Sequence, residues 1–289
     1  MDSRYHYDPS RTPFDPHIRG YHPHNALWLA AAGNLAYEAE ETIRTTVREW
    51  GFPRFAFLHA STVMGTAGVP VPVDTQAFVC SGRDTTLIAF RGTEALNIKD
   101  WVTDLMIATV YAPVGVGKVH RGFDAAFAAI RPQLELALNE QYDGHSPIWI
   151  TGHSLGGALS ILAAAQLSFA QKLPVQGVYT FVQPRVGDRT FAKFVRKALQ
   201  DRVVRFVNDR DIVPQVPSPG MLIKYRHHVP DTHFDPVGNL VMRRSWADRT
   251  RSFLRGSPRK IAQLGIEGFT DHCMDRYIEH IRRLVETST

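Results

Sequence analysis

The pentapeptide Gly152-His153-Ser154-Leu155-Gly156 has the residue types and spacing of a nucleophilic catalyst. The apolar run 147–151 before it is typical of a strand, and the Ala- and Leu-rich residues 157–165 after it favour a helix. A serine between the two elements lies on a sharp turn, where flanking glycines leave room for a strained backbone. The helix start also brings backbone N–H groups and a positive dipole end to a developing oxyanion. The pattern therefore predicts a nucleophilic Ser154, with a glycine-rich turn before a helix as the alternative.

A serine hydroxyl is a weak nucleophile near neutral pH, so it needs a histidine base that is oriented by a carboxylate. On a sheet that carries this type of turn, the order along the chain is serine, carboxylate, histidine. Asp209 and Asp211 follow the β-like run 202–207, which is where a carboxylate at a strand end is expected. Spacing alone does not separate the five histidines farther along the chain, which are His227, His228, His233, His272 and His280.

Strand-like and helix-like segments alternate through most of the chain. The apolar pattern of 25–50 predicts a helix, Asp188 suits the N-cap of another, and 271–286 predicts a closing helix. The continuous apolar run 85–90 is typical of a buried central strand. Further strands are expected at 54–63, 75–81, 177–182 and 202–207, followed by a β-hairpin region at 221–243 and an Arg-rich helical excursion at 244–268. This alternation predicts an α/β protein with a mixed, mostly parallel central sheet flanked by helices.

Length and composition favour one large domain. The chain has 289 residues, of which 44% are hydrophobic, so a single α/β domain over 25–289 accounts for most of it. Residues 1–24 contain four prolines and predict an extended N-terminal arm. The formal charge of +5 is interpreted as a solvated Arg-rich surface, because no nucleic-acid-binding motif accompanies it.

Cysteines and histidines indicate neither a disulfide scaffold nor a metal site. Two cysteines, Cys80 and Cys273, in a chain of this length do not favour a structural disulfide. The pairs His22/His24 and His227/His228 lack the spacing of a metal site, and hydrolysis by a serine triad needs no metal. We therefore expect no cofactor and no metal. Nothing in the sequence indicates an oligomeric state.

The N-terminal residues carry no targeting pattern. Residues 1–9 are polar and contain no apolar h-region, so the sequence predicts no signal peptide. No apolar run approaches the length that spans a membrane. These observations favour a cytoplasmic protein and leave secretion by another route open.

Several ordered motifs carry a resemblance to a known family. They lie at expected strand ends or turns between about residues 75 and 277. They are Phe90-Arg91-Gly92-Thr93, Val119-His120-Arg121-Gly122-Phe123, the serine pentapeptide, Gln183-Pro184-Arg185-Val186-Gly187-Asp188, Asp211-Ile212-Val213-Pro214 and Asp271-His272. With these motifs the chain resembles the class 3 (fungal-type) lipase family, whose members have the α/β-hydrolase fold.

The resemblance implies how the site is completed. It selects Asp211 rather than Asp209 as the carboxylate and His272 as the base. One oxyanion donor is the backbone N–H of Leu155, the residue after the nucleophile. The second, by resemblance, is Thr93, whose alternative role is a capping residue in a loop. Arg91 is expected to brace the loop, and His120 and His153 to act as supports.

The segment 94–106 resembles the lid of this family. Its apolar residues fall at helical spacing, with Lys99, Asp100 and Thr103 on the other face. Closed, the apolar face would cover the acyl pocket; open, it would meet a lipid–water interface. A helix that stays packed on the core has the same periodicity, so both interpretations are kept. The apolar residues are Ile98, Trp101, Val102, Leu105 and Met106.

Together these observations predict a serine carboxylester hydrolase. Its expected substrates are acylglycerols or related lipid esters, cleaved through an acyl-enzyme at a transient contact with a lipid–water interface. A phospholipase A1 and a feruloyl or aryl esterase are alternatives within the same chemistry. A non-catalytic lipid-binding protein is the alternative from a different class.

Overall fold

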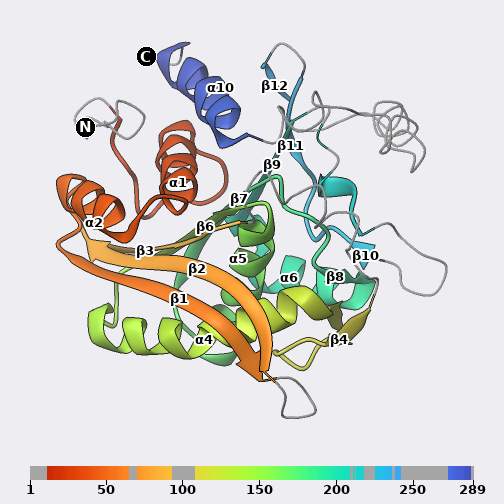
Figure 1. Cartoon of the computed structure of the whole chain (residues 1–289). Coiled ribbons are helices and arrows are strands. Elements are labelled where there is room, and N and C mark those ends of the chain that lie inside the picture. Colours follow the sequence, from red (N-terminus) through yellow and green to blue (C-terminus); the bar gives the residue numbers. More distant parts are fainter. Residues whose placement is uncertain are drawn as a thin grey trace.

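The structure, a computed structural model, describes residues 12–64, 70–92, 108–208, 211, 213–217, 225–235, 238–241 and 273–287. Its centre is an eight-stranded sheet with the order β1-β2-β3-β6-β7-β9-β11-β12 (Figure 1). The strands are β1 (Arg54–Met64), β2 (Pro70–Gly82), β3 (Thr85–Phe90), β6 (Ile148–His153), β7 (Val175–Phe181), β9 (Val203–Asn208), β11 (Thr232–Phe234) and β12 (Leu240–Val241).

The middle of this sheet is parallel and its margins are antiparallel. Strands β3, β6, β7, β9 and β11 pair in parallel, whereas β1–β2, β2–β3 and β11–β12 pair antiparallel. The mixed, mostly parallel sheet expected from the sequence is therefore confirmed. Because parallel strands end at one edge, the residues that follow β3, β6 and β9 come together there.

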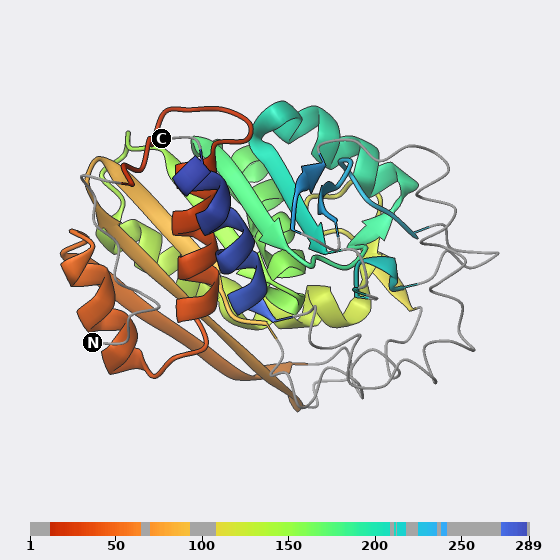
Figure 2. The ribbon, with the colours of Figure 1, turned by 90° about the horizontal axis from the view of Figure 1, so that it is seen from above.

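Helices cover both faces of the sheet, as Figure 1 shows. One face carries α1 (Pro23–Leu35), α2 (Glu40–Glu49) and α10 (Met274–Thr287), and the other carries α4 (Arg121–Gln141), α5 (Leu155–Ala165) and α6 (Arg189–Leu199). Short helical turns complete these elements at η2 (Gln166–Ala170), η3 (Gln200–Arg202) and η4 (Val213–Gln215). In the view from above, α1 and α10 lie side by side over the sheet (Figure 2).

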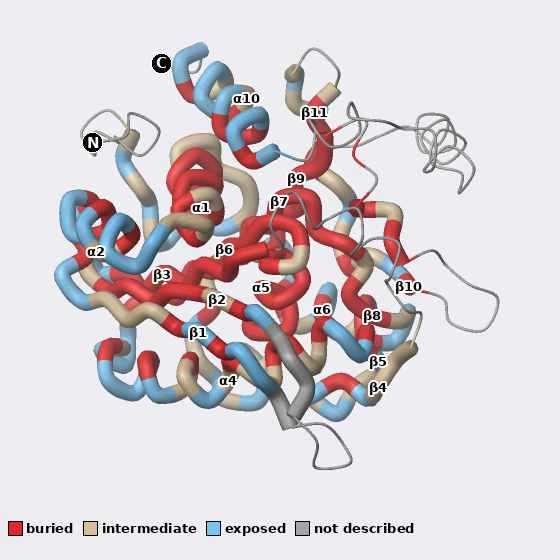
Figure 3. Tube along the Cα trace, in the orientation of Figure 1, coloured by how far each residue is buried: buried red, intermediate tan, exposed pale blue. Residues whose placement is uncertain are grey.

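Two hydrophobic cores lie between the helices and the sheet. Alternate residues of β3 point to opposite cores: Leu87 and Ala89 pack toward α1 and α10, while Ile88 and Phe90 pack toward α4 and α5. The central strands are buried along their length (Figure 3). A strand covered on both faces must be largely apolar. For this reason the continuous apolar run 85–90 correctly predicted a central strand.

The single helix expected over 25–50 is wrong, because the structure divides this segment into α1 and α2. Gly33 and Asn34 are weak helix formers and directly precede the end of α1. A turn follows, in which the N–H of Tyr37 donates to Asn34 and that of Glu38 donates to Leu35. Helix α1 is buried almost all round, whereas α2 buries only one stripe. The two helices therefore pack against the rest of the protein in different ways.

Residues 12–22 form no helix or strand and lie against the sheet. The indole N–H of Trp149 donates to the carbonyl of Pro16 at 3.0 Å, and Tyr179 Oη donates to that of Gly20 at 2.6 Å. The Phe14 ring packs edge-on against Trp149. These contacts attach the described part of the N-terminal arm to buried strand residues. The division into an arm at 1–24 and one domain at 25–289 stays a prediction.

A second, smaller sheet was not expected from the sequence. Its antiparallel strands are β4 (Thr109–Tyr111), β5 (Lys118–His120), β8 (Gly187–Asp188) and β10 (Tyr225–Arg226), in the order β10-β8-β5-β4. The late hairpin expected over 221–243 is correct for β11 and β12 only, because β10 pairs with β8. Strands of two or three residues are too short to show a period in sequence.

The cap of α6, the closing helix and the two cysteines lie within the described ranges. Asp188 caps α6, with its Oδ1 accepting from the N–H of Phe191 at 2.8 Å. The closing helix begins at Met274, and Cys80 and Cys273 are both free thiols. Within the described ranges, no helix has the length and apolar character to cross a membrane. Residues 244–268 lie outside those ranges.

Candidate active site

Ser154 occupies a sharp turn between β6 and α5. Its backbone angles are φ 55° and ψ −121°, a conformation that costs free energy for a residue with a Cβ. The chain leaves the sheet at His153 and enters the helix at Leu155. The strand–turn–helix expected around the pentapeptide is therefore confirmed, and the strain falls on the serine itself.

The two flanking glycines allow the turn to close. A Cβ on Gly152 would overlap the carbonyl of Gly156, and a Cβ on Gly156 would overlap the carbonyl of Phe90 at the end of β3. Both positions therefore require the absence of a side chain for a steric reason. The close approach brings the first turn of α5 against the end of β3, where the loop that follows β3 begins.

The Ser154 hydroxyl is buried and has no hydrogen-bond partner among the described residues. Buried hydroxyls are nearly always paired, so an orphaned one in a native structure calls for an explanation. At the apex of a strained turn, the explanation we favour is chemical: the oxygen is held for a base and a substrate.

A tyrosine that the sequence analysis missed holds the residue before the serine. Tyr37 Oη lies 2.8 Å from Nδ1 of His153, which is itself buried. Tyr37 follows α1 and is 116 positions away in sequence, so no local pattern connects the two. His153 thus supports the turn, as expected, and Tyr37 is an additional positioning residue.

The loop after β3 begins beside the serine. A Cβ on Gly92 would lie 3.2 Å from the Cβ of Ser154 and would overlap Tyr37 Oη. Thr93, the expected second oxyanion donor, is the next residue and lies outside the described ranges. Leu155 is the first residue of α5, so its N–H has no acceptor within the helix and is free for an oxyanion.

Two side chains near these loops have structural roles, as expected. Arg91 pairs with Asp74 on β2 and thereby anchors the end of β3. His120 caps α4, its Nδ1 accepting from the N–H of Gly122 at 3.1 Å.

Asp211 follows β9 and is buried, with 2% of its surface exposed. Its Oδ1 accepts a hydrogen bond from the N–H of Val213 at 2.9 Å. Strand β9 lies two strands from β6 in the parallel part of the sheet, so Asp211 and Ser154 follow strands that end at the same edge. Asp209 lies outside the described residues.

Four of the five candidate histidines are described, and none of them bonds the Ser154 hydroxyl. His227 donates from Nε2 to the carbonyl of Pro214 at 2.7 Å. Desolvation, with nearby Arg205, lowers the pKa of His227 well below its usual value and that of His228 to about 3. His233 lies in β11, and His280 stacks on Phe234. His272 lies outside the described ranges, two residues before α10 begins.

Helix α10 is attached to the segment that carries Asp211. The backbone N–H of Asn208, the last residue of β9, donates to Tyr277 Oη at 2.7 Å. Tyr277 is in the first turns of α10, and its ring packs edge-on against Phe181 and Phe234. The start of α10 is therefore held near the end of β9.

The remaining predicted features are a lid and the absence of a metal. The apolar residues assigned to the lid, from Ile98 to Met106, all lie outside the described ranges. In the part of the chain that is described, no group of three or more potential ligands is placed to hold a metal ion.

The chain is similar in sequence to known proteins. The sequence profile of the family described as Lipase (class 3) matches residues 87–221. A lipase from Rhizomucor miehei is 37% identical over 153 residues, covering 50% of this chain and 41% of its own length. Residues 87–221 thus match the class 3 lipase family.

Two further matches extend beyond the matched segment. Triacylglycerol lipase OBL1 from Arabidopsis thaliana is 26% identical over 87% of this chain and 63% of its own length. The solved structure of a triacylglycerol lipase, described as having a catalytic centre formed by a serine protease triad, superposes with a TM-score of 0.56. It is 27% identical and covers 73% of this chain and 78% of its own. The α/β-hydrolase fold follows from this likeness.

The class 3 lipase segment contains Ser154 and Asp211 and ends before His272. The chain also spans less than two thirds of the length of these two relatives. The family match rests on this central region, the fold rests on the likeness to the solved structure, and the activity is argued separately from the site.

Proposed function

We propose that this chain is a serine carboxylester hydrolase that cleaves acylglycerols or related lipid esters through an acyl-enzyme. The observation that carries the proposal is the strained, buried Ser154 with an unpartnered hydroxyl at the start of α5. A residue in so unfavourable a conformation persists only where the surroundings impose it, and such positions cluster at active sites.

The proposed reaction uses five residues. His272 takes the proton of Ser154 Oγ, and the oxygen attacks the ester carbonyl. The N–H groups of Leu155 and Thr93 stabilise the resulting oxyanion. Protonated His272 then gives its proton to the departing alcohol, and Asp211 holds the imidazole in the productive tautomer. In the second half, water loses a proton to His272 and attacks the acyl-enzyme, which releases the fatty acid and restores Ser154.

The placement of α10 supports His272 as the base. The Tyr277–Asn208 hydrogen bond holds the start of α10 beside the end of β9, and Asp211 lies three residues after Asn208. His272 precedes the first residue of α10 by two positions in the sequence. His227 has its Nε2 proton committed to Pro214, and His228 stays neutral because of its burial. Neither is suited to take the proton of Ser154.

Two observations support the oxyanion donors. Leu155 begins α5, so its N–H points out of the first turn together with the positive end of the helix dipole. Gly92 lies against Ser154, and Thr93 is the next residue in the chain. In related chemistries the loss of one such donor lowers kcat about 100- to 1,000-fold.

Labelling with a fluorophosphonate probe tests the nucleophile without assuming a substrate. We expect the wild type and Ser168→Ala to be labelled and Ser154→Ala not to be labelled. Ser168 is the matched control, because it lies just after α5 in η2 and outside the turn. Labelling of Ser154→Ala at the wild-type rate would remove the assignment of the nucleophile, and no labelling of the wild type would favour a non-catalytic lipid-binding protein.

A substrate panel tests the lipid ester. It contains triacylglycerols of several chain lengths, phosphatidylcholine and aryl esters, each measured below and above the concentration at which an interface forms. The proposal expects the highest kcat/KM on an acylglycerol. A maximum on phosphatidylcholine would indicate a phospholipase A1, and a maximum on a soluble aryl ester would indicate an aryl esterase.

A further inference from the structure

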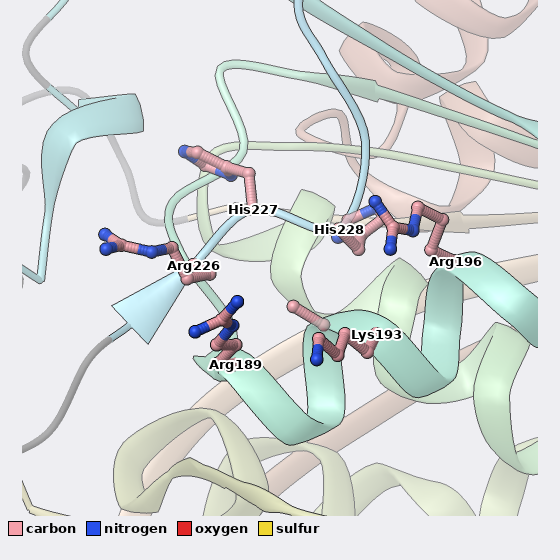
Figure 4. A pocket seen from close by; sticks show the side chains of 7 residues that line it. Arg189, Lys193, Arg196, Arg226, His227 and His228 are labelled. Atoms are coloured by element: carbon pink, nitrogen blue, oxygen red, sulfur yellow. The ribbon is translucent and has the colours of Figure 1, made fainter.

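A row of cationic side chains follows one face of α6. Arg189, Ala192, Lys193 and Arg196 are spaced at i, i+3, i+4 and i+7, so they share that face. Arg226 on β10, with His227 and His228 after it, lies opposite this row. These seven residues line a pocket of about 370 Å³ (Figure 4). None of them belongs to the serine turn.

The pocket gathers charge from two separate segments of the chain. In Figure 4, Arg189 and Arg226 lie on one side of it, and Lys193, Arg196 and His228 lie on the other. Strand β10 reaches this position because it pairs with β8, which leads directly into α6. The pairing of β10 with β8 thereby brings side chains about 30 positions apart in sequence to the same pocket.

The positive charge of the pocket is not neutralised within the described structure. None of its four cationic side chains forms an ion pair or hydrogen bond with a described residue. Two acidic side chains close in sequence to the lining residues have other contacts: Asp188 caps α6, and the Asp231 carboxylate lies 3.8 Å from the Arg205 guanidinium. Four cations around one space repel one another, so an anion between them is stabilising.

His228 supplies a second, independent indication of a ligand. It is 5% exposed and lines the pocket, and its Nε2 has no hydrogen-bond partner among the described residues. A buried polar atom is normally paired, and an unpaired one indicates a bound partner or a functional role. A neutral imidazole can donate from Nε2 to an anionic oxygen without carrying a charge itself.

We propose that this pocket binds a phosphate group. A phosphate monoester carries close to two negative charges and three strong acceptor oxygens, which match the forked N–H groups of arginine. The volume lies in the range of small-molecule sites, about 300–1,000 Å³, so space remains for the group that carries the phosphate. That carrier is either a soluble phosphomonoester or the headgroup of phosphatidic acid. The site goes beyond the proposed hydrolase activity and does not depend on it.

The first experiment measures binding of soluble phosphates to the full chain. Inorganic phosphate and glycerol 3-phosphate are titrated by calorimetry, with glycerol as the uncharged comparison. The pocket variant is Lys193→Gln/Arg196→Gln, and the matched control is Arg48→Gln/Lys197→Gln, which loses the same charge from exposed helical positions outside the pocket. We expect binding at least tenfold weaker in the pocket variant and unchanged in the control.

The second experiment separates the two carriers. Co-sedimentation with phosphatidylcholine vesicles, with and without phosphatidic acid, is measured for the same proteins. Binding of glycerol 3-phosphate identifies a soluble carrier, whereas binding to phosphatidic acid vesicles alone identifies the headgroup. In either case the pocket variant must lose binding and the control must keep it.

A third variant, His228→Gln, removes the imidazole without changing the charge of the patch. We expect it to weaken phosphate binding several-fold, which attraction to a basic surface alone would not do. All variants are compared by circular dichroism and melting temperature to show that they are folded. Equal binding by the pocket variant and the control overturns the proposal, and so does the absence of binding to every phosphate compound.

Discussion

The backbone N–H of Asn208 donates to Tyr277 Oη at 2.7 Å, and this bond joins the last residue of a central strand to the closing helix. Both residues are buried, and they are 69 positions apart in sequence. The bond fixes where α10 begins relative to the segment that carries Asp211. In the proposed triad, the carboxylate follows β9 and the base precedes α10, which are the two elements that this bond joins.

Tyr277→Phe tests this relationship. The substitution keeps the ring and leaves the buried N–H of Asn208 without its acceptor, so we expect a loss of stability of about 1–3 kcal/mol. We also expect kcat on an ester to fall while KM changes little, because the substrate does not contact the tyrosine. Urea denaturation and steady-state kinetics measure the two effects. Unchanged stability together with unchanged kcat would show that the bond does not position the triad.

The base is tested by His272→Ala against His280→Gln. Without a base, Ser154 is not deprotonated, and residual catalysis comes from the oxyanion donors and binding alone. We expect kcat to fall at least about 1,000-fold for His272→Ala. His280 lies on α10 and stacks on Phe234, so its replacement should leave kcat within a fewfold of the wild type. A larger effect at His280 than at His272 would reverse the assignment.

Local patterns predicted the parts of the site that local geometry determines. The serine turn, the strand at 85–90 and the position of Asp211 after a strand each depend on a few neighbouring residues. Tyr37 and Tyr277 were missed because their partners, His153 and Asn208, are far along the chain. The second sheet was missed for a related reason, since strands such as Gly187–Asp188 exist only through pairing with distant segments. The phosphate pocket depends on that pairing too.

Gly156→Ala and Gly157→Ala form a matched pair of neighbouring substitutions. A Cβ at Gly156 would overlap the carbonyl of Phe90, and backbone cannot move aside cheaply, so we expect destabilisation of about 1–3 kcal/mol and loss of activity. At Gly157 the nearest atom is Gln183 Cβ at 3.1 Å, a contact that a small shift relieves, and alanine also favours the helix. We expect Gly157→Ala to be close to neutral by thermal denaturation. Equal losses for the two variants would contradict the steric argument.

The two imidazoles that line the phosphate pocket make stability depend on pH. Burial, with the charge of Arg205, lowers the pKa of His228 to about 3, whereas an unfolded histidine titrates near about 6.5. Below the unfolded pKa, the unfolded chain binds a proton that the folded chain does not, so stability falls as the pH falls from that value to about 3. One such group contributes about 1.4 kcal/mol per pH unit within this window.

Urea denaturation between pH 7 and pH 5 checks this dependence. We expect His228→Gln to make the stability less sensitive to pH in that range. His17→Gln, which removes an exposed imidazole, should keep the wild-type dependence. His227 acts in the same direction, because desolvation and Arg205 also lower its pKa, so the single variant removes only part of the effect. An unchanged slope for His228→Gln would show that this imidazole binds protons equally in the folded and the unfolded chain.

Tyr37→Phe and Tyr142→Phe test whether the bond to His153 supports the nucleophile. Tyr37 Oη bonds His153 Nδ1 at 2.8 Å, whereas the buried Tyr142 Oη has no hydrogen-bond partner in the described structure. Removal of the first hydroxyl deletes its hydrogen bond to the imidazole beside the strained turn, so we expect a loss of about 1–2 kcal/mol and a lower rate of fluorophosphonate labelling of Ser154. Removal of the second hydroxyl should be neutral or slightly stabilising, with an unchanged labelling rate. Because labelling reports on the serine itself, a slower reaction in a variant that remains folded assigns Tyr37 a positioning role, whereas a stability loss with unchanged labelling limits it to packing.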